Sequence, residues 1–236
     1  MAAQNLFGFV TLLMVLLGCS QKPAGDVMFP LAEGRVWKYH TTISYTKDSE
    51  LVHEDMALRS LGVETYGDST VWRRRSDLGV DYWLKADDSG VYRVASKTDA
   101  SREPMADSQP RYVLRKPYVV GTEWMNTTAL YVLDRPTEYR REFRKSHSSM
   151  PMTYKITALD EKVKTPAGNF ESCIKVQGSA SIKLYIDATG IWDNAPIKTT
   201  EWYCPNVGLT KLVREEISPT KMLRGGGLVM ELTSFK

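Results

Sequence analysis

Cysteine is scarce in this sequence, which has three cysteines in 236 residues. So low a number excludes a small disulfide-dense scaffold, in which closely spaced cysteines compensate for a missing hydrophobic core. Histidine is equally scarce: His40, His53 and His147 lie far apart in the sequence, and none has Cys or carboxylate neighbours at the spacing of a zinc motif. We therefore expect no metal site and no cofactor.

An excess of one charge is also missing. The formal net charge is only +3, with 25% of the residues charged, which argues against nucleic acid as a partner. The hydrophobic share of 42% is ordinary for a globular protein and predicts a packed core. The chain has no Gly-x-Ser-x-Gly elbow, and its Ser-x-x-Lys sequences at Ser44 and Ser218 lack a Lys-Thr-Gly companion. We therefore predict no catalytic residue and no enzyme activity.

Long hydrophobic runs are absent as well. The longest, Leu6–Leu17, contains twelve uncharged residues, whereas a membrane-spanning helix needs about 20. The run ends at Gly18-Cys19, and a polar segment containing Ser20 and Pro23 follows. This is the anatomy of a signal peptide, so we expect residues 1–18 to be removed.

The sequence Leu16-Leu17-Gly18-Cys19 resembles the lipobox of bacterial lipoproteins. The resemblance implies cleavage between Gly18 and Cys19, a lipid on the Cys19 sulfur and acylation of the new N-terminus, so that the partner of Cys19 is the lipid bilayer. Ser20, where an Asp would retain the protein in the inner membrane, implies the periplasmic face of the outer membrane. The sequence departs from the usual lipoprotein signal in two ways: it has no Lys or Arg before Leu6, and Leu17 is bulkier than the residue usual at that position. A secretory signal without lipidation is the alternative.

Residues 19–28 are expected to form a short tether. An extended chain of seven to ten residues reaches roughly 25–35 Å, so the folded part would lie close to the bilayer. We interpret residues 29–236 as a single β-rich domain.

Alternation of apolar and polar residues dominates this domain. Trp37, Tyr39, Thr41 and Ile43 alternate with polar residues, and a longer alternating run from Phe170 to Ile186 is one bent strand or a pair. Such alternation is typical of half-buried strands. The other β-type stretches are Ser69–Arg75, Val80–Lys85, Val91–Ala95, Trp124–Leu133, Glu138–Lys145, Thr153–Lys164, Thr199–Tyr203, Leu209–Glu215 and Leu228–Phe235. With short connections, they predict an all-β fold: an antiparallel curved sheet or incomplete barrel.

Two pairs of sequences suggest an internal duplication. Pro-x-x-x-Gly-x-x-Trp occurs at 30–37 and again at 117–124, and Tyr82-Trp83 before Gly90 is echoed by Trp202-Tyr203 before Gly208. We interpret these as two β-meander halves, residues 29–110 and 116–236, that bury a shared sheet face. Turn residues that coincide by chance are the alternative.

Several of these motifs together resemble the TapB-like group of secreted bacterial domains. They are Phe29-Pro30-Leu31 before Gly34-x-x-Trp37-x-Tyr39, Val163-x-Thr165-Pro166-Ala167-Gly168-x-Phe170, and Trp202-Tyr203-x-Pro205-x-Val207-Gly208-Leu209. The resemblance implies an all-β fold of unknown function, and it carries over no catalytic residue.

Cys173 and Cys204 remain after lipidation of Cys19. Alternation places Cys173 on the polar face of its strand, where a lone thiol is a liability in an oxidising compartment. A disulfide to Cys204 would close a loop of about 30 residues and stabilise the fold by roughly 3–4 kcal/mol. Two separate thiols are the alternative.

The function that these features favour is a non-catalytic envelope module that contacts a lipid, glycan or protein. Trp72, Trp83, Trp124 and Tyr185 are candidates for its surface. The alternatives are a hydrolase whose site assembles from distant residues and a structural component of an envelope assembly.

Two basic runs, Arg73–Arg75 and Arg140–Lys145, have two interpretations: they contact anionic lipid, or they form a solvated strand face. The glycine run Gly225–Gly227 is expected to connect a hairpin.

Overall fold

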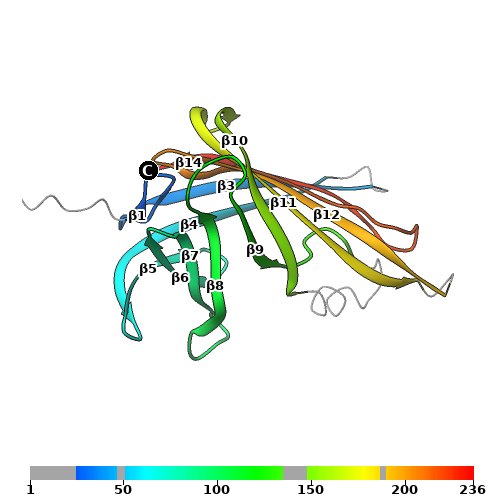
Figure 1. Cartoon of the computed structure of the whole chain (residues 1–236), viewed down its shortest axis with the longest axis horizontal. Coiled ribbons are helices and arrows are strands. Elements are labelled where there is room, and N and C mark those ends of the chain that lie inside the picture. Colours follow the sequence, from blue (N-terminus) through cyan, green and yellow to red (C-terminus); the bar gives the residue numbers. More distant parts are fainter. Residues whose placement is uncertain (1–24, 47–50, 135–147, 187–189) are drawn as a thin grey trace, which may run out of the picture.

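The fold consists of strands, as the alternation predicts. The computed structural model describes residues 25–46, 51–134, 148–186 and 190–236. All regular elements of these ranges are β-strands, and twelve of them, β3 to β14, form one antiparallel sheet (Figure 1). No helix able to cross a membrane occurs among these residues. The predicted all-β class is confirmed.

The large sheet runs in nearly sequential order from one edge to the other. Its strands, in that order, are β8 (Met105–Arg115), β7 (Gly90–Thr98), β6 (Val80–Asp87), β5 (Ser69–Ser76), β4 (Leu51–Tyr66), β3 (Val36–Tyr45), β14 (Gly226–Phe235), β13 (Gly208–Glu216), β12 (Ile191–Cys204), β11 (Gly168–Ile186), β10 (Met150–Thr165) and β9 (Glu123–Thr128). Two short strands, β1 (Gly25–Asp26) and β2 (Phe29–Pro30), form a separate hairpin.

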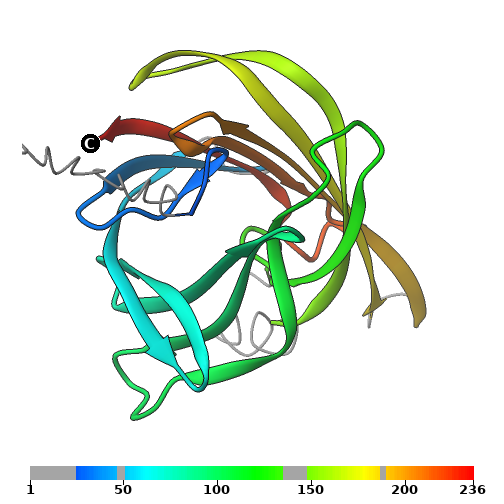
Figure 2. The same ribbon diagram turned by 60° about the vertical axis from the view of Figure 1, so that its left-hand side comes forward.

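The sheet curls until its two edges, β8 and β9, approach each other. Figure 2 shows the ribbon curving around an interior. No backbone ladder joins the edges among the described residues; side chains bridge them instead. Arg111 donates to the Thr127 carbonyl at 2.6 Å, and Asn126 Nδ2 donates to the Tyr112 carbonyl at 3.0 Å. The fold is therefore an almost closed barrel with one unsealed seam.

The sheet divides into two six-strand meanders, β3–β8 and β9–β14, and β8 extends to Arg115, past residue 110 where the predicted first half ends. The repeated Pro-x-x-x-Gly-x-x-Trp sequence leads into β3 and β9, and the second repeat spans the β6/β7 and β12/β13 hairpins. Each repeated feature is thus displaced by six strands. Gly34 and Gly121 both have positive φ, +80° and +99°, a conformation that explains glycine at both positions.

Both ends of the barrel are covered by segments that run inward. At one end, β2 brings Phe29 into the core and Leu31 follows it with no exposed surface. At the other end, residues 129–134 follow β9, and Leu133 is fully buried there. Figure 1 places β1 and the C-terminus at one end of the long axis and the paired ends of β11 and β12, near Ile186 and Ile191, at the other.

Three sequence-based predictions need correction. The Phe170–Ile186 run is one strand, but Ser172 has φ +54° and interrupts its alternation, so Cys173 is buried rather than on the polar face. The stretch predicted to reach Leu133 is a strand only to Thr128. Gly226 and Gly227 belong to β14 instead of a hairpin connection. The predicted strand 138–145 lies outside the described residues.

Candidate functional site

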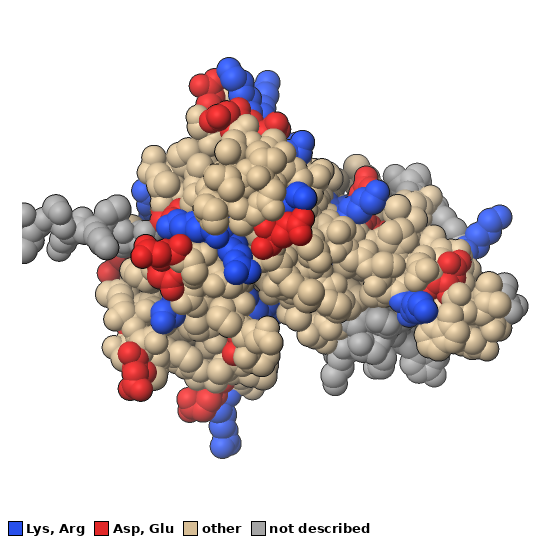
Figure 3. Space-filling view, in the orientation of Figure 1, with Lys and Arg blue, Asp and Glu red and all other residues tan. Residues whose placement is uncertain are grey.

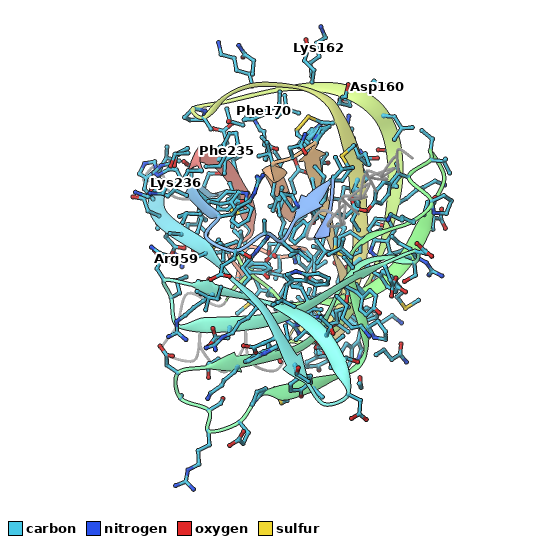
Figure 4. All side chains as sticks on the ribbon, turned by 90° about the vertical axis from the view of Figure 1, so that its left-hand side faces the viewer. Arg59, Asp160, Lys162, Phe170, Phe235 and Lys236 are labelled. Atoms are coloured by element: carbon cyan, nitrogen blue, oxygen red, sulfur yellow. A yellow bond between two sulfur atoms is a disulfide. The ribbon has the colours of Figure 1, made fainter. Side chains whose placement is uncertain are left out.

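A pocket of about 260 Å³ lies in the barrel interior, next to the seam. It draws side chains from both halves of the sheet. Figure 4 looks into the barrel from the end that carries Phe235 and Lys236. Its lining mixes apolar, aromatic and charged side chains: Phe29, Leu58, Arg74, Tyr82, Leu84, Arg93, Arg111, Tyr112, Val113, Asn126, Tyr154, Glu201 and Tyr203. Alternation explains the set, because every second residue of a curled strand faces the interior.

Arg74 on β5 is the most deeply buried cation of the pocket, with 6% of its surface exposed. Its guanidinium carbon lies 4.3 Å from the ring centre of Phe29 and 4.1 Å from that of Trp37. One terminal nitrogen donates to the Pro30 carbonyl at 2.9 Å, whereas Nε has no partner in the described chain. Burial lowers the pKa of Arg74 to about 10, so the side chain stays charged at neutral pH.

Glu201 on β12 supplies a carboxyl group from the other half of the sheet. The Tyr203 hydroxyl donates to its Oε2 at 2.6 Å. Burial raises the pKa of Glu201, while the hydrogen bond from Tyr203 and the charge of Arg214 act in the opposite direction. The Tyr203 pKa is raised well above its usual value by burial and by Glu201. Glu201 therefore holds its proton to a higher pH than an exposed glutamate does.

Two further arginines share one carboxylate beside the seam. Arg93 Nε and a terminal nitrogen donate to the two oxygens of Asp107 at 2.7 and 2.6 Å, a bidentate pair. Arg111 lies 4.0 Å from the same carboxylate. Burial lowers the Arg111 pKa, and the charge of Arg93 lowers it further. With Arg74, three arginines thus line the pocket, which holds one carboxyl group, Glu201, and has Asp107 beside it, so cations outnumber carboxyl groups.

The predicted site residues have mixed outcomes. Gly18 and Cys19 lie outside the described residues, as do His147 and the basic run 140–145. Cys173 and Cys204 are joined by a disulfide, with an S–S distance of 1.99 Å.

The candidate surface residues also need correction. Trp83 and Trp124 are buried, each with 4% of its surface exposed, whereas Tyr185 is exposed and Trp72 is half-buried. Because β5 alternates, Arg74 of the basic run points inward, while its neighbours Arg73 and Arg75 pair with Asp81. A basic run in a strand is therefore not automatically a solvated face.

Two of the widely separated histidines meet on the outer face of the sheet. His40 and His53 stack with ring centres 5.2 Å apart, and His40 Nδ1 lies 2.7 Å from Asp55 Oδ1. The pairing of β3 with β4 explains the approach. Within the described ranges, no group of three metal-binding side chains is present.

Sequence reasoning missed Arg74 and Glu201 as pocket residues. A signal existed for Glu201, which shares the alternating face of Ile197, Thr199 and Tyr203. A carboxyl group in register with apolar and aromatic residues points into a core. Arg74 carried a weaker signal, because the run Arg73–Arg75 conceals which of the three arginines faces inward.

Comparison with known proteins gives two structural matches. The chain is similar to the crystal structure of a putative lipoprotein from Parabacteroides distasonis, at 19% identity and a TM-score of 0.39, over 90% of this chain and 99% of that one. It is also similar to a putative exported protein with a YmcC-like fold from Bacteroides fragilis, at 18% identity and a TM-score of 0.37, over 88% and 98%. Likeness at this level carries no information on ligand, partner or location.

No protein-family model matches the chain, and no curated protein matches it. The resemblance to the TapB-like group therefore stays a prediction.

Proposed function

We propose that this protein is a lipid-anchored, non-catalytic binding module of the bacterial cell envelope, and that its barrel interior holds a small ligand. The pocket beside the seam is the observation that carries the proposal. Protein interiors are normally packed with few voids, and a concave, largely apolar pocket with a few convergent polar groups is the usual form of a ligand site.

The outer surface offers a weaker alternative. On the face seen in Figure 3, acidic and basic side chains are interspersed rather than gathered into one patch of a single sign. Of the exposed hydrophobic residues, Leu78 and Met125 come from separate parts of the chain, and the group of Tyr185, Ile191 and Trp192 is confined to the paired ends of β11 and β12. A small-molecule ligand inside the barrel is therefore favoured over a lipid surface, a glycan or a protein as the principal partner.

The composition of the pocket supports binding over catalysis. Among the described residues that line it, none is a Ser, Thr, Cys or His, the usual nucleophiles and bases. A hydrolase stays the rival hypothesis because Glu201 is a buried carboxyl group with a raised pKa in a cleft, a property of many catalytic acids.

Location enters the proposal through the sequence. The lipobox-like Leu16–Cys19 supports an anchor at Cys19, and the six residues 19–24 that precede β1 would reach about 20 Å if extended. The barrel would then lie against the membrane, on the periplasmic face of the outer membrane. Replacing Cys19 with Ala should move the protein from the membrane fraction to the soluble fraction; unchanged membrane association would contradict the anchor.

A ligand that co-purifies tests the binding function directly. The full-length protein is extracted from its own membranes in mild detergent and examined by native mass spectrometry. We expect an additional mass on the wild-type protein and on Val63→Trp, an exposed strand position, but not on Val113→Trp, which fills the pocket. A mass retained by Val113→Trp, or no mass on any of the three, would count against the proposal, and turnover of an envelope substrate would favour the hydrolase.

A further inference from the structure

Arg74 lies in the barrel as a cation without an anionic partner. No Asp or Glu of the described chain is within ion-pair distance of its guanidinium, and the one group whose charge raises its pKa is Tyr39, which is neutral near pH 7. Arg93, by contrast, is matched by the bidentate contact with Asp107. Arg111 lies 4.0 Å from the same carboxylate. Of the three arginines of the pocket, Arg74 is therefore the one without a carboxylate within ion-pair distance.

The existing contacts of Arg74 leave part of its hydrogen-bonding capacity unused. The aromatic rings of Phe29 and Trp37 lie within 4.3 Å of the guanidinium carbon and stabilise the cation through its faces. The Pro30 carbonyl takes one N–H at the edge. The Nε–H, also at the edge of the plane, is buried and has no acceptor. An unpaired donor of a buried charge is costly, so an acceptor that lies in this plane would be stabilising.

We propose that Arg74 binds the carboxylate of a small monoanionic ligand whose aliphatic or aromatic body lies against Tyr82, Leu84 and Val113. The inference rests on the proposed binding function and names the ligand class. A carboxylate is planar and accepts two parallel N–H bonds from the edge of a guanidinium. The apolar lining beside Arg74 supplies the contact for the body of the ligand.

The other ionisable group of the pocket limits the charge of the ligand. Glu201 lines the same pocket and is itself acidic. A dianionic phosphate would place two negative charges near this carboxyl group, which is unfavourable in a poorly solvated interior. Arg93 and Arg111 already share Asp107, so Arg74 is the cation that remains for a ligand, and one negative charge balances it. The electrostatics therefore favour a carboxylic acid over a phosphate ester.

The size of the pocket limits the body of the ligand. Its volume of about 260 Å³ lies just below the range of about 300–1,000 Å³ that is usual for ligand pockets. An acid with one ring or a short alkyl chain is therefore favoured over a complete phospholipid or an oligosaccharide.

The test compares two probes that differ only in charge, 3-phenylpropionate and its neutral amide 3-phenylpropionamide. Isothermal titration calorimetry of each into the detergent-solubilised full-length protein, with micelle blanks, should show that the acid binds about tenfold tighter or more than the amide, the effect of a hydrogen bond to a charged group. Equal affinities would overturn the proposal. Tighter binding of phenyl phosphate than of 3-phenylpropionate would overturn the choice of a carboxylate.

Three variants separate recognition from folding. Arg74→Met should bring the acid-to-amide ratio close to one, and Arg74→Lys, which keeps the charge but loses the planar edge, should retain part of it. Arg75→Met, the adjacent residue outside the pocket, should keep the wild-type ratio. If Arg74→Met does not fold, the Arg74→Lys ratio decides: an unchanged preference for the acid contradicts a role for the planar edge. A co-purified mass that persists while the probes show no charge preference would leave the binding function standing and reject only this inference.

Discussion

Ser60 in β4 and Ile156 in β10 make the same pair of backbone hydrogen bonds. The Gly34 N–H donates to the Ser60 carbonyl at 3.0 Å, and the Gly121 N–H donates to the Ile156 carbonyl at 2.9 Å; each of the two residues then donates its own N–H to the carbonyl that follows the glycine. The strand register shifts within two residues of both positions. The match supports the predicted duplication of a β-meander.

The equivalence also explains why the pocket is asymmetric. Arg74 on β5 is the ladder partner of Ser60, and Val176 on β11 is the ladder partner of Ile156. Their next partners across the sheet are Tyr82 and Glu201. One half of the barrel therefore has the cation Arg74 where the other half has Val176, and the other half has the carboxyl group of Glu201 where the first has Tyr82.

Gly226 is predicted to be intolerant of any side chain. A Cβ there would overlap the carbonyl oxygen of Ser44 on the neighbouring strand β3, because the two backbones approach closely at the junction of the halves. We expect Gly226→Ala to lower the free energy of unfolding by about 1–3 kcal/mol, as overpacking does. Gly227→Ala is the matched control, since its Cβ would meet nothing nearer than 3.5 Å. Equal denaturation midpoints for the two variants would contradict the prediction.

The strands show how far the sequence predicts the fold. Alternation was sufficient for strands with one apolar face, such as β3, which the structure reproduces. It missed β4 and β8, whose outer portions expose long series of residues on both faces and so show no alternation. It also misread Gly226 as a loop residue. The backbone that approaches Gly226 belongs to Ser44, which is distant in the sequence, so the approach leaves no local signal.

The pocket was less predictable than the fold for a related reason. Its charged residues come from β5, β7, β8 and β12, so their proximity depends on how the sheet curls. The position of Cys173 likewise depended on a single residue, Ser172 with φ +54°, which local alternation does not reveal. Pattern predicts which residues face inward more reliably than it predicts which inward residues meet.

Glu216 is predicted to be essential for closing one end of the barrel. Its buried carboxylate accepts the backbone N–H groups of Val132 and Leu133 at 2.9 and 2.6 Å, together with that of Tyr131, and pairs with Arg214 at 2.6 Å. Glu216→Ala removes the acceptor and leaves Arg214 unpaired, so we expect a loss of about 3–5 kcal/mol in unfolding free energy.

The adjacent Glu215 provides the control for this prediction, because its side chain is exposed. Glu215→Ala should change the chemical denaturation midpoint little. Hydrogen exchange adds a local readout: in Glu216→Ala the amides of residues 131–133 should exchange faster. Unaltered exchange of these amides would mean that the carboxylate does not hold the segment.

The Cys173–Cys204 disulfide is predicted to stabilise the domain mainly through the unfolded state. The two residues are 31 apart in the sequence, and closing a loop of this length contributes roughly 3–4 kcal/mol in the chain-entropy treatment. Urea denaturation of the Cys173→Ala, Cys204→Ala double variant should therefore show a lower midpoint than the oxidised protein. The reduced wild-type protein is the control for lost packing, because it keeps both buried sulfur atoms; a midpoint equal to that of the oxidised protein would refute the prediction.

Glu201 is predicted to make stability depend on pH. Burial raises its pKa in the folded state above the ordinary value of 4.5, so the folded protein binds this proton more tightly than the unfolded chain does. The resulting stability is complete below about pH 4.5 and is lost as pH rises through the folded pKa. Glu201→Gln cannot ionise and still accepts a hydrogen bond from Tyr203, so its unfolding free energy should fall less between pH 4.5 and neutrality. Glu123→Gln, at an exposed ion pair with Lys155, should keep the wild-type slope; identical slopes for both variants would show that Glu201 ionises normally.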